Sequence, residues 1–117
     1  MLIFYLEDNH QDANLVARYL QTTPHEMILA ANLEQAHQAL ARQPDLFIVD
    51  LLIGASRDGF KFARELREQG CTQPIIAITA LTTPQDLNEC QEAGINGVLP
   101  KPFTINKLAD MIQHYTS

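Results

Sequence analysis

Short apolar runs alternate along this chain with segments whose apolar residues recur at helical spacing. The runs at 46–49 and 75–78 contain no alternating polar residue, which is typical of strands covered on both faces of a sheet. Strands that alternate with helices predict a parallel sheet with right-handed crossovers and a layer of helices on each face. The sequence therefore predicts an α/β fold, a doubly wound parallel sheet of five strands with five helices.

Polar and small residues mark where the predicted elements begin and end. Asn32 and Thr83 are residue types that cap the start of a helix, and Gly70 and Gly94 suit its end. We expect strands at residues 2–6, 25–30, 45–49, 75–78 and 96–99. We expect helices at residues 11–22, from Asn32 to Pro44, from Asp58 to Gly70, from Thr83 to Gly94 and after Thr104. The sequence contains no linker or repeat, so residues 1–117 are interpreted as a single domain.

The composition argues against several classes of function. The formal net charge is −6 and the basic residues do not cluster, which argues against direct binding to nucleic acid. No apolar stretch approaches the roughly 20 residues that cross a bilayer, so we expect no membrane partner. The sequence begins on an expected strand and not on a signal peptide, and Cys71 and Cys90 lack metal-binding spacing. We therefore expect a cytoplasmic location.

Four of the predicted strands are followed by a residue type that takes part in phosphoryl chemistry. Glu7 and Asp8 follow the first strand, Asp50 the third, Thr79 the fourth and Lys101 the fifth. Taken singly, each has a simpler interpretation as a helix cap or a solvated side chain. The carboxyl ends of parallel strands meet at one edge of a sheet, however, so these groups should lie together. Carboxylates suit Mg²⁺, and hydroxyl and ammonium donors suit phosphate oxygens.

This set of residues resembles the receiver domain of two-component response regulators, and the resemblance extends over the whole chain. It rests on Glu7-Asp8, Asp50, Thr79-Ala80 and Lys101-Pro102-Phe103, taken in this order and at these separations. The resemblance implies a flavodoxin-like strand order, 2-1-3-4-5. It also implies a switch that accepts a phosphoryl group, and not an enzyme that releases a product.

The resemblance assigns a role to each residue of the acidic group. Asp50 would be the phosphoacceptor, whose carboxylate attacks phosphorus to give an acyl phosphate. The implied cofactor is Mg²⁺, because two anions that approach each other need a cation between them. Asp8 and Asp50 would bind this ion directly, Glu7 through water, and Leu52 through its backbone carbonyl.

The resemblance also implies how the phosphoryl group and the partner protein are bound. Thr79, Ala80 and Lys101 would hold the phosphoryl oxygens, and the peptide bond before Pro102 would be cis. The partners would be a histidine kinase or a histidine phosphotransfer protein, and a downstream effector that the sequence does not name. The donor should dock around the site, on Asn9, His10, Asp12, Ala13 and Phe103. Phe103 is either an exposed anchor or packed under its loop.

The sequence departs from the usual pattern of the family at three positions. Gly54 stands where the family usually has proline, and residues 55–57 lengthen the loop, which leaves the position of the Leu52 carbonyl open. Val98 replaces an aromatic residue that moves on activation in most relatives, and Leu81 replaces a residue that is often polar. Because valine has no ring to move, we expect weak coupling to an output.

Other functions remain to be weighed against this interpretation. A receiver-like relay, phosphate sink or binding module would have the same fold with weak output. A flavodoxin-like electron carrier would bind FMN at the same edge, but residues 8–11 lack a Ser/Thr/Gly-rich phosphate cradle. An aspartate-nucleophile phosphatase would need a second aspartate where Leu52 stands. The aromatic residues are interpreted as core: Phe4, Tyr5, Phe47, Phe60 and Phe62.

Overall fold

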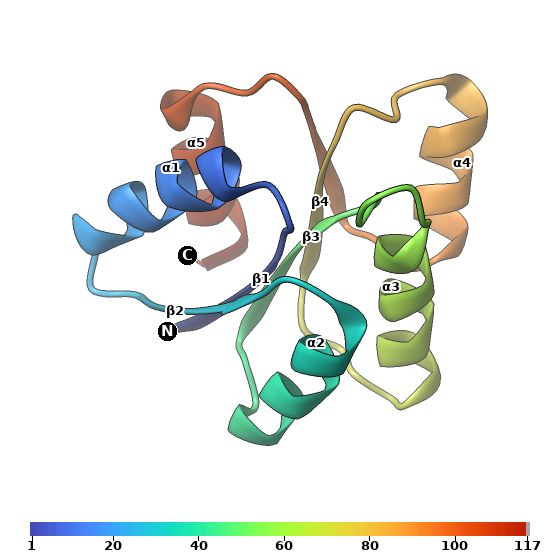
Figure 1. Cartoon of the computed structure of the whole chain (residues 1–117), viewed down its shortest axis with the longest axis horizontal. Coiled ribbons are helices and arrows are strands. Elements are labelled where there is room, and N and C mark those ends of the chain that lie inside the picture. The colour runs from blue at the N-terminus through green and yellow to red at the C-terminus, as the bar shows by residue number, and fades with distance from the viewer. Residues whose placement is uncertain (117) are drawn as a thin grey trace.

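Five parallel strands form the centre of the computed structural model, which describes residues 1–116 (Figure 1). The strand order is β2-β1-β3-β4-β5, which confirms the predicted order 2-1-3-4-5. The strands are β1 (Leu2–Leu6), β2 (Glu26–Ala30), β3 (Leu46–Asp50), β4 (Ile75–Thr79) and β5 (Gly97–Pro100). Every side chain of β3 and β4 is buried, as the uninterrupted apolar runs predict for strands between two helix layers.

Helices cover both faces of the sheet (Figure 1). On one face α1 and α5 pack against Ile3, Tyr5 and Ile48, and on the other face α2, α3 and α4 pack against Phe4 and Phe47. The helices are α1 (His10–Gln21), α2 (Leu33–Ala39), α3 (Asp58–Glu68), α4 (Pro84–Glu92) and α5 (Ile105–Thr116). Within residues 1–116, none of these helices has the length and apolar character needed to cross a membrane.

The capping residues predicted for α2 and α4 are confirmed, but the predicted end of α2 is not. The Asn32 and Thr83 side chains accept hydrogen bonds from the first turns of α2 and α4, as predicted. The second helix is shorter than predicted. It ends at Ala39, a single 3₁₀ turn follows (Leu40–Arg42), and Gln43 then takes a left-handed conformation with φ of 55°. Pro44 explains this end, because a residue that precedes proline is disfavoured in the helical conformation.

The register of the sheet brings the polar strand ends to one edge. Leu6 pairs with Val49, so Glu7 and Asp50 come next at adjacent positions. Thr79 pairs with Pro100, so Lys101 follows at the same edge. The third and fifth strands are shifted by one residue from their predicted ranges, and Asp50 is therefore the last residue of β3 itself. The parallel sheet thus places carboxylates, a hydroxyl and an ammonium group within reach of one another.

Candidate functional site

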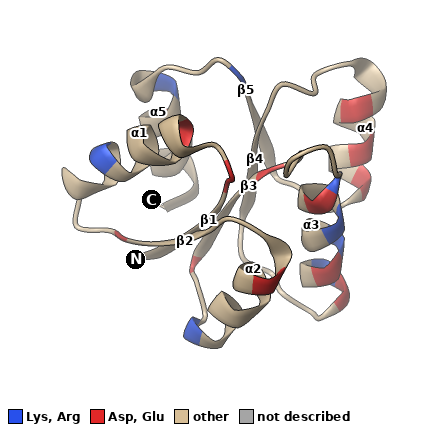
Figure 2. Ribbon diagram, viewed as in Figure 1, with Lys and Arg blue, Asp and Glu red and all other residues tan. Residues whose placement is uncertain are grey.

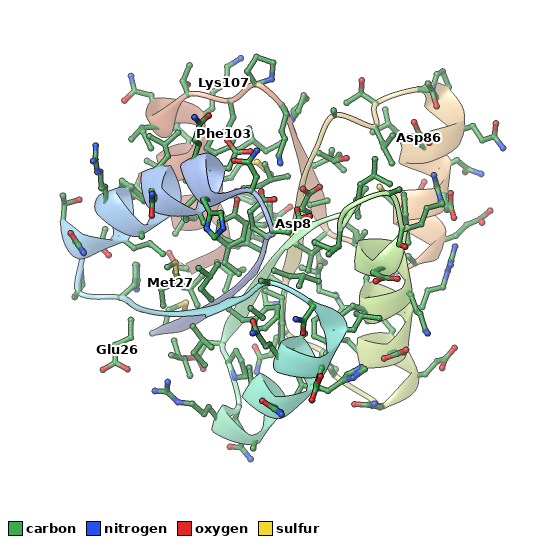
Figure 3. The ribbon with its side chains drawn as sticks, in the orientation of Figure 1. Asp8, Glu26, Met27, Asp86, Phe103 and Lys107 are labelled. Carbon is green, nitrogen blue, oxygen red and sulfur yellow. The ribbon has the colours of Figure 1, made fainter. Side chains whose placement is uncertain are left out.

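Three carboxylates gather where β1 and β3 end. Carboxylate oxygens of Glu7, Asp8 and Asp50 all lie within 4.8 Å of one another. Figure 2 shows acidic residues at the ends of these two strands, and Figure 3 shows Asp8 at this edge of the sheet. Glu7 and Asp50 are buried, whereas Asp8 is exposed. Carboxylate oxygens at this spacing, partly open to solvent, are a donor set that fits a hard divalent cation such as Mg²⁺.

The Lys101 ammonium lies among the carboxylates. Its Nζ is 2.9 Å from Glu7 Oε1, 3.0 Å from Asp50 Oδ2 and 2.9 Å from Asp12 Oδ2. Burial by itself lowers the pKa of Lys101, but the contacts with Asp12, Glu7 and Asp50 outweigh it and raise the pKa above its ordinary value. The ammonium therefore stays protonated at neutral pH, and its charge balances part of the negative charge of the site.

Glu7 is the most enclosed of the three carboxylates. It accepts a hydrogen bond from the Tyr5 hydroxyl at 2.9 Å and one from the backbone N–H of Asn9 at 3.3 Å. Burial, and then the neighbouring Asp50, raise the pKa of Glu7 to about 7, while the Lys101 and Tyr5 contacts act in the opposite direction. Burial, together with the charge of Glu7, also raises the pKa of Tyr5.

Tyr5 was interpreted from the sequence only as a core residue, and its contact with Glu7 was missed. The ring is fully buried against the core that α1 and α5 cover, as predicted. The sequence did contain a signal, because residues two apart in a strand point to the same face of the sheet. A tyrosine two residues before a buried glutamate is therefore positioned to donate to it.

Thr79 and Lys101 lie side by side at the ends of β4 and β5. The Lys101 backbone N–H donates to the Thr79 carbonyl at 2.8 Å, and the peptide bond between Lys101 and Pro102 is cis. Thr79 is buried, and its hydroxyl accepts a hydrogen bond from the Leu81 N–H at 2.9 Å. Among the hydrogen bonds of residues 1–116, none joins the Thr79 hydroxyl to the carboxylates. Ala80, the next residue, is exposed.

The long loop after Asp50 folds back toward the carboxylates. Ile53 and Ser56 pair as a short antiparallel bridge, with N–H···O distances of 2.9 and 3.1 Å. Gly54 lies at the turn with φ of 61°, and its N–H donates to Asp8 Oδ2 at 2.7 Å. The Leu52 N–H donates to Asp50 Oδ1 at 3.2 Å. The sequence predicted a longer loop here but not its contact with Asp8, because the two residues are far apart in the chain.

Gly59, at the start of α3, permits close packing beneath the site. A Cβ atom on this residue would lie 2.0 Å from the Asp50 carbonyl oxygen and 2.5 Å from the Leu51 Cα. The Gly59 N–H instead donates to the Leu51 carbonyl at 3.2 Å. The sequence predicts a helix that starts at Asp58, next to Gly59, but it does not predict this close packing of Gly59 on the backbone of Asp50.

The predicted docking residues have different environments in the structure. Asn9 and His10 are exposed, and the Asn9 side chain caps α1 by accepting from the Asp12 N–H at 3.0 Å. Ala13 is 4% exposed and belongs to the buried stripe of α1, so it offers a partner little surface. Phe103 is partly buried and packs against the core beneath α1 and α5. A hollow of about 450 Å³ lies beside it, lined by Asp12, Leu15, Ala80, Lys101, Pro102 and Phe103.

Nearly the whole chain matches one known family. The sequence model of the response regulator receiver domain matches residues 3–113. The chain belongs to this family. It is a receiver domain of two-component signalling systems, and the phosphoacceptor role expected from its strand-end residues fits. A flavodoxin-like electron carrier is not favoured.

The receiver domain is similar to proteins from several bacteria. It is 31% identical to the transcriptional regulatory protein CiaR of Streptococcus pneumoniae over 95% of this chain and 49% of CiaR. The chain therefore spans about half the length of this relative. Among solved structures, the chemotaxis protein CheY4 of Vibrio cholerae matches with a TM-score of 0.88 and 26% identity, covering 97% of each chain.

A receiver domain from a sensor histidine kinase is also similar. The domain from Pseudomonas aeruginosa is 32% identical and matches with a TM-score of 0.83. The match covers 97% of this chain and 95% of the Pseudomonas aeruginosa domain. That structure has a magnesium ion coordinated in its active site cleft. Similar receiver domains thus occur both in a transcriptional regulator and in a sensor kinase.

Proposed function

We propose that this receiver domain accepts a phosphoryl group on Asp50 from the phosphohistidine of a histidine kinase or histidine phosphotransfer protein. The observation that carries the proposal is the position of the Asp50 carboxylate, which lies within 4.8 Å of carboxylate oxygens of Glu7 and Asp8 and 3.0 Å from the Lys101 ammonium. In the reaction an Asp50 oxygen bonds to phosphorus while the phosphorus–nitrogen bond breaks. The electron pair of that bond stays on the imidazole nitrogen, which then takes up a proton.

The acidic group supports a role for Mg²⁺ in this reaction. Asp8 and Asp50 would bind the ion directly, Glu7 through water and Leu52 through its backbone carbonyl. When bound, Mg²⁺ would neutralise the carboxylates and draw a phosphoryl oxygen toward Asp50. The magnesium ion reported in the similar Pseudomonas aeruginosa domain supports this assignment.

The remaining residues would bind the phosphoryl group once it is attached. Lys101 would donate to one phosphoryl oxygen, and the Thr79 hydroxyl and the Ala80 N–H to others. The group stays on the protein until water removes it, so the domain acts as a switch and not as an enzyme with a released product. The free cysteines Cys71 and Cys90 support action in the cytoplasm, where thiols stay reduced.

Labelling with a small phosphodonor tests this function. We expect acetyl phosphate with Mg²⁺ to add the mass of one phosphoryl group to the wild-type protein. Asp50→Asn should abolish the added mass, and both Asp8→Asn and a chelator should slow its appearance. Asp110→Asn is the control: it removes one negative charge at an exposed position of α5, and the variant should be labelled at the wild-type rate. Labelling of Asp50→Asn at the wild-type rate would contradict the proposal.

Val98 supports a second candidate function within the same family, a relay or phosphate sink. The side chain lies in β5, is partly buried and packs against the core that α2, α3 and α4 cover. Valine has no ring that could move between solvent and the interior. Phosphorylation would then change the outer surface little, and the group would pass to a second phosphotransfer protein and not to an effector.

A further inference from the structure

One contact at this site involves a residue outside the motif that identifies the family. Asp12 lies in the first turn of α1, and its Oδ2 is 2.9 Å from the Lys101 ammonium. We propose that Asp12 is a positioning residue for Lys101: it holds the ammonium when a cation occupies the acidic group, and competes with the phosphoryl group for it. The proposal rests on the proposed function of Asp50.

The geometry gives the Lys101 ammonium two kinds of partner. Lys101 Nζ donates hydrogen bonds to Glu7 and Asp50 at 2.9 and 3.0 Å, and it forms an ion pair with Asp12 at 2.9 Å. Glu7 and Asp50 belong to the group of carboxylates that could hold a cation, and Asp12 does not. A cation at that group therefore competes with the ammonium for Glu7 and Asp50, but leaves the contact with Asp12 intact.

The surroundings of Asp12 keep it close to Lys101 and partly hydrated. Its backbone N–H donates to the Asn9 side chain that caps α1, and its side chain is 28% exposed. Asp12 and Lys101 also line the same hollow beside Phe103. The ammonium can therefore remain with Asp12 without entering the apolar core, where an unpaired charge would be costly.

Loss of the Asp12 carboxylate should change the affinities for Mg²⁺ and for a phosphoryl group in opposite directions. Without it, the ammonium binds only Glu7 and Asp50, so it opposes a cation at these residues more strongly. A phosphoryl group, in contrast, no longer competes with Asp12 for the ammonium and no longer meets its negative charge. We therefore expect Asp12→Asn to weaken the binding of Mg²⁺ and to strengthen the binding of a phosphoryl mimic.

A double-mutant cycle separates this role from a general loss of negative charge. Mg²⁺ binding is measured by calorimetry for the wild type, Asp12→Asn, Lys101→Met and the double variant, and beryllofluoride binding is measured at saturating Mg²⁺. Asp12→Asn should raise the dissociation constant for Mg²⁺ about two- to five-fold and lower that for beryllofluoride by a similar factor, as expected for a partly exposed ion pair. In the Lys101→Met background the same change should leave Mg²⁺ binding almost unaltered.

Three further variants serve as controls. Asp12→Glu keeps the charge and should bind both ligands nearly as the wild type does. Glu34→Gln removes an exposed carboxylate from the first turn of α2 and should change neither affinity. Asp12→Ser repeats the loss of charge with a residue suited to a first helical turn, so that a folding defect of Asp12→Asn would not leave the proposal without a test.

The outcomes separate failure of this inference from failure of the proposed function. A wild-type protein that binds neither Mg²⁺ nor beryllofluoride would overturn both. A wild-type protein that binds both, with unchanged affinities in Asp12→Asn and Asp12→Ser, would overturn the inference alone. The inference would also be overturned if Asp12→Asn changed the affinity for Mg²⁺ equally in the wild-type and Lys101→Met backgrounds. Asp12 would not then act through the Lys101 ammonium.

Discussion

Glu7 shows at the scale of a single residue how burial and charge oppose each other. Its side chain is enclosed by the protein, and its carboxylate contacts the Tyr5 hydroxyl and the Lys101 ammonium. Burial disfavours the ionised form more than these contacts favour it, so the pKa of Glu7 rises from 4.5 to about 7. The folded protein therefore binds a proton at Glu7 more tightly than the unfolded chain does.

This shift predicts how the stability depends on pH. A raised pKa in the folded state contributes stability that is fully present below about pH 4.5 and is lost as the pH rises through about 7. We expect the free energy of unfolding of the wild type, relative to that of Glu7→Gln, to fall between these pH values. Urea denaturation of both proteins at several pH values measures the difference. Parallel pH profiles would contradict the prediction, because exposed carboxylates contribute equally to both.

The residues at the site differ in how far the sequence could predict them. Asp8, Asp50, Thr79 and Lys101 could be placed together because a parallel sheet brings the ends of its strands to one edge. The contact of Lys101 with Asp12 could not be predicted, since an acidic residue in the first turn of a helix gives no sign of a partner so distant in the chain. Contacts of this kind depend on how the helices pack, which local patterns do not determine.

At the scale of elements, one arginine connects α3 to the turns that precede β4 and β5. The Arg67 guanidinium donates to the carbonyls of Cys71 and Gln73 at 2.9 and 2.8 Å. It also donates to the Gly94 carbonyl and to the Asn96 side chain, both at 2.8 Å. A planar group with five donors can join all four acceptors at once, whereas an ammonium has only three donors.

Replacing this arginine should therefore destabilise the fold even when the charge is kept. We expect Arg67→Lys to lower the free energy of unfolding by about 2 kcal/mol. Some of the carbonyls that accept hydrogen bonds from Arg67 would lose their donor in this variant. Arg42→Lys is the matched control, because Arg42 is mostly exposed and lies 3.7 Å from an exposed Glu26. Its effect should stay within about 0.5 kcal/mol. Urea denaturation of both variants measures the difference, and equal effects would contradict the assigned role of Arg67.

The helices and strands were largely predictable, and the loop between β3 and α3 was not. Apolar spacing and caps located the elements because each buries one stripe or face. In the loop, Arg57 contacts Glu89 and lies 4.0 Å from Asp86, so it connects the start of α3 to α4. These ion pairs join residues from separate parts of the chain, and no periodic pattern marks them.

At the scale of the whole molecule, a switch needs two states whose contacts differ in free energy. In most relatives an aromatic ring in the fifth strand supplies part of this difference, and here Val98 occupies its position. We expect beryllofluoride with Mg²⁺ to shift amide signals near Asp50 and Lys101 strongly, and those of residues 84–98 and 105–115 only weakly. Two-dimensional NMR spectra with and without the mimic measure these shifts.

A variant with an aromatic ring provides the comparison for this prediction. Val98→Phe restores a ring that can move, so the same signals along α4 and α5 should shift further than they do in the wild type. Large shifts along both helices in the wild type would show that the domain signals by another route. The Arg57 ion pairs with α4 would then be the first contacts to examine.

The hydrogen bond from Gly54 to Asp8 has a consequence for how this domain differs from its relatives. The family usually has proline at this position, and proline carries no N–H, so this hydrogen bond cannot form there. A ligand that binds Asp8 Oδ2 competes with the Gly54 N–H for this oxygen, and so weakens one of the contacts between the loop and the site. In this chain ligand binding at Asp8 is therefore coupled to the position of the loop through this hydrogen bond, and a proline at residue 54 could not provide that coupling.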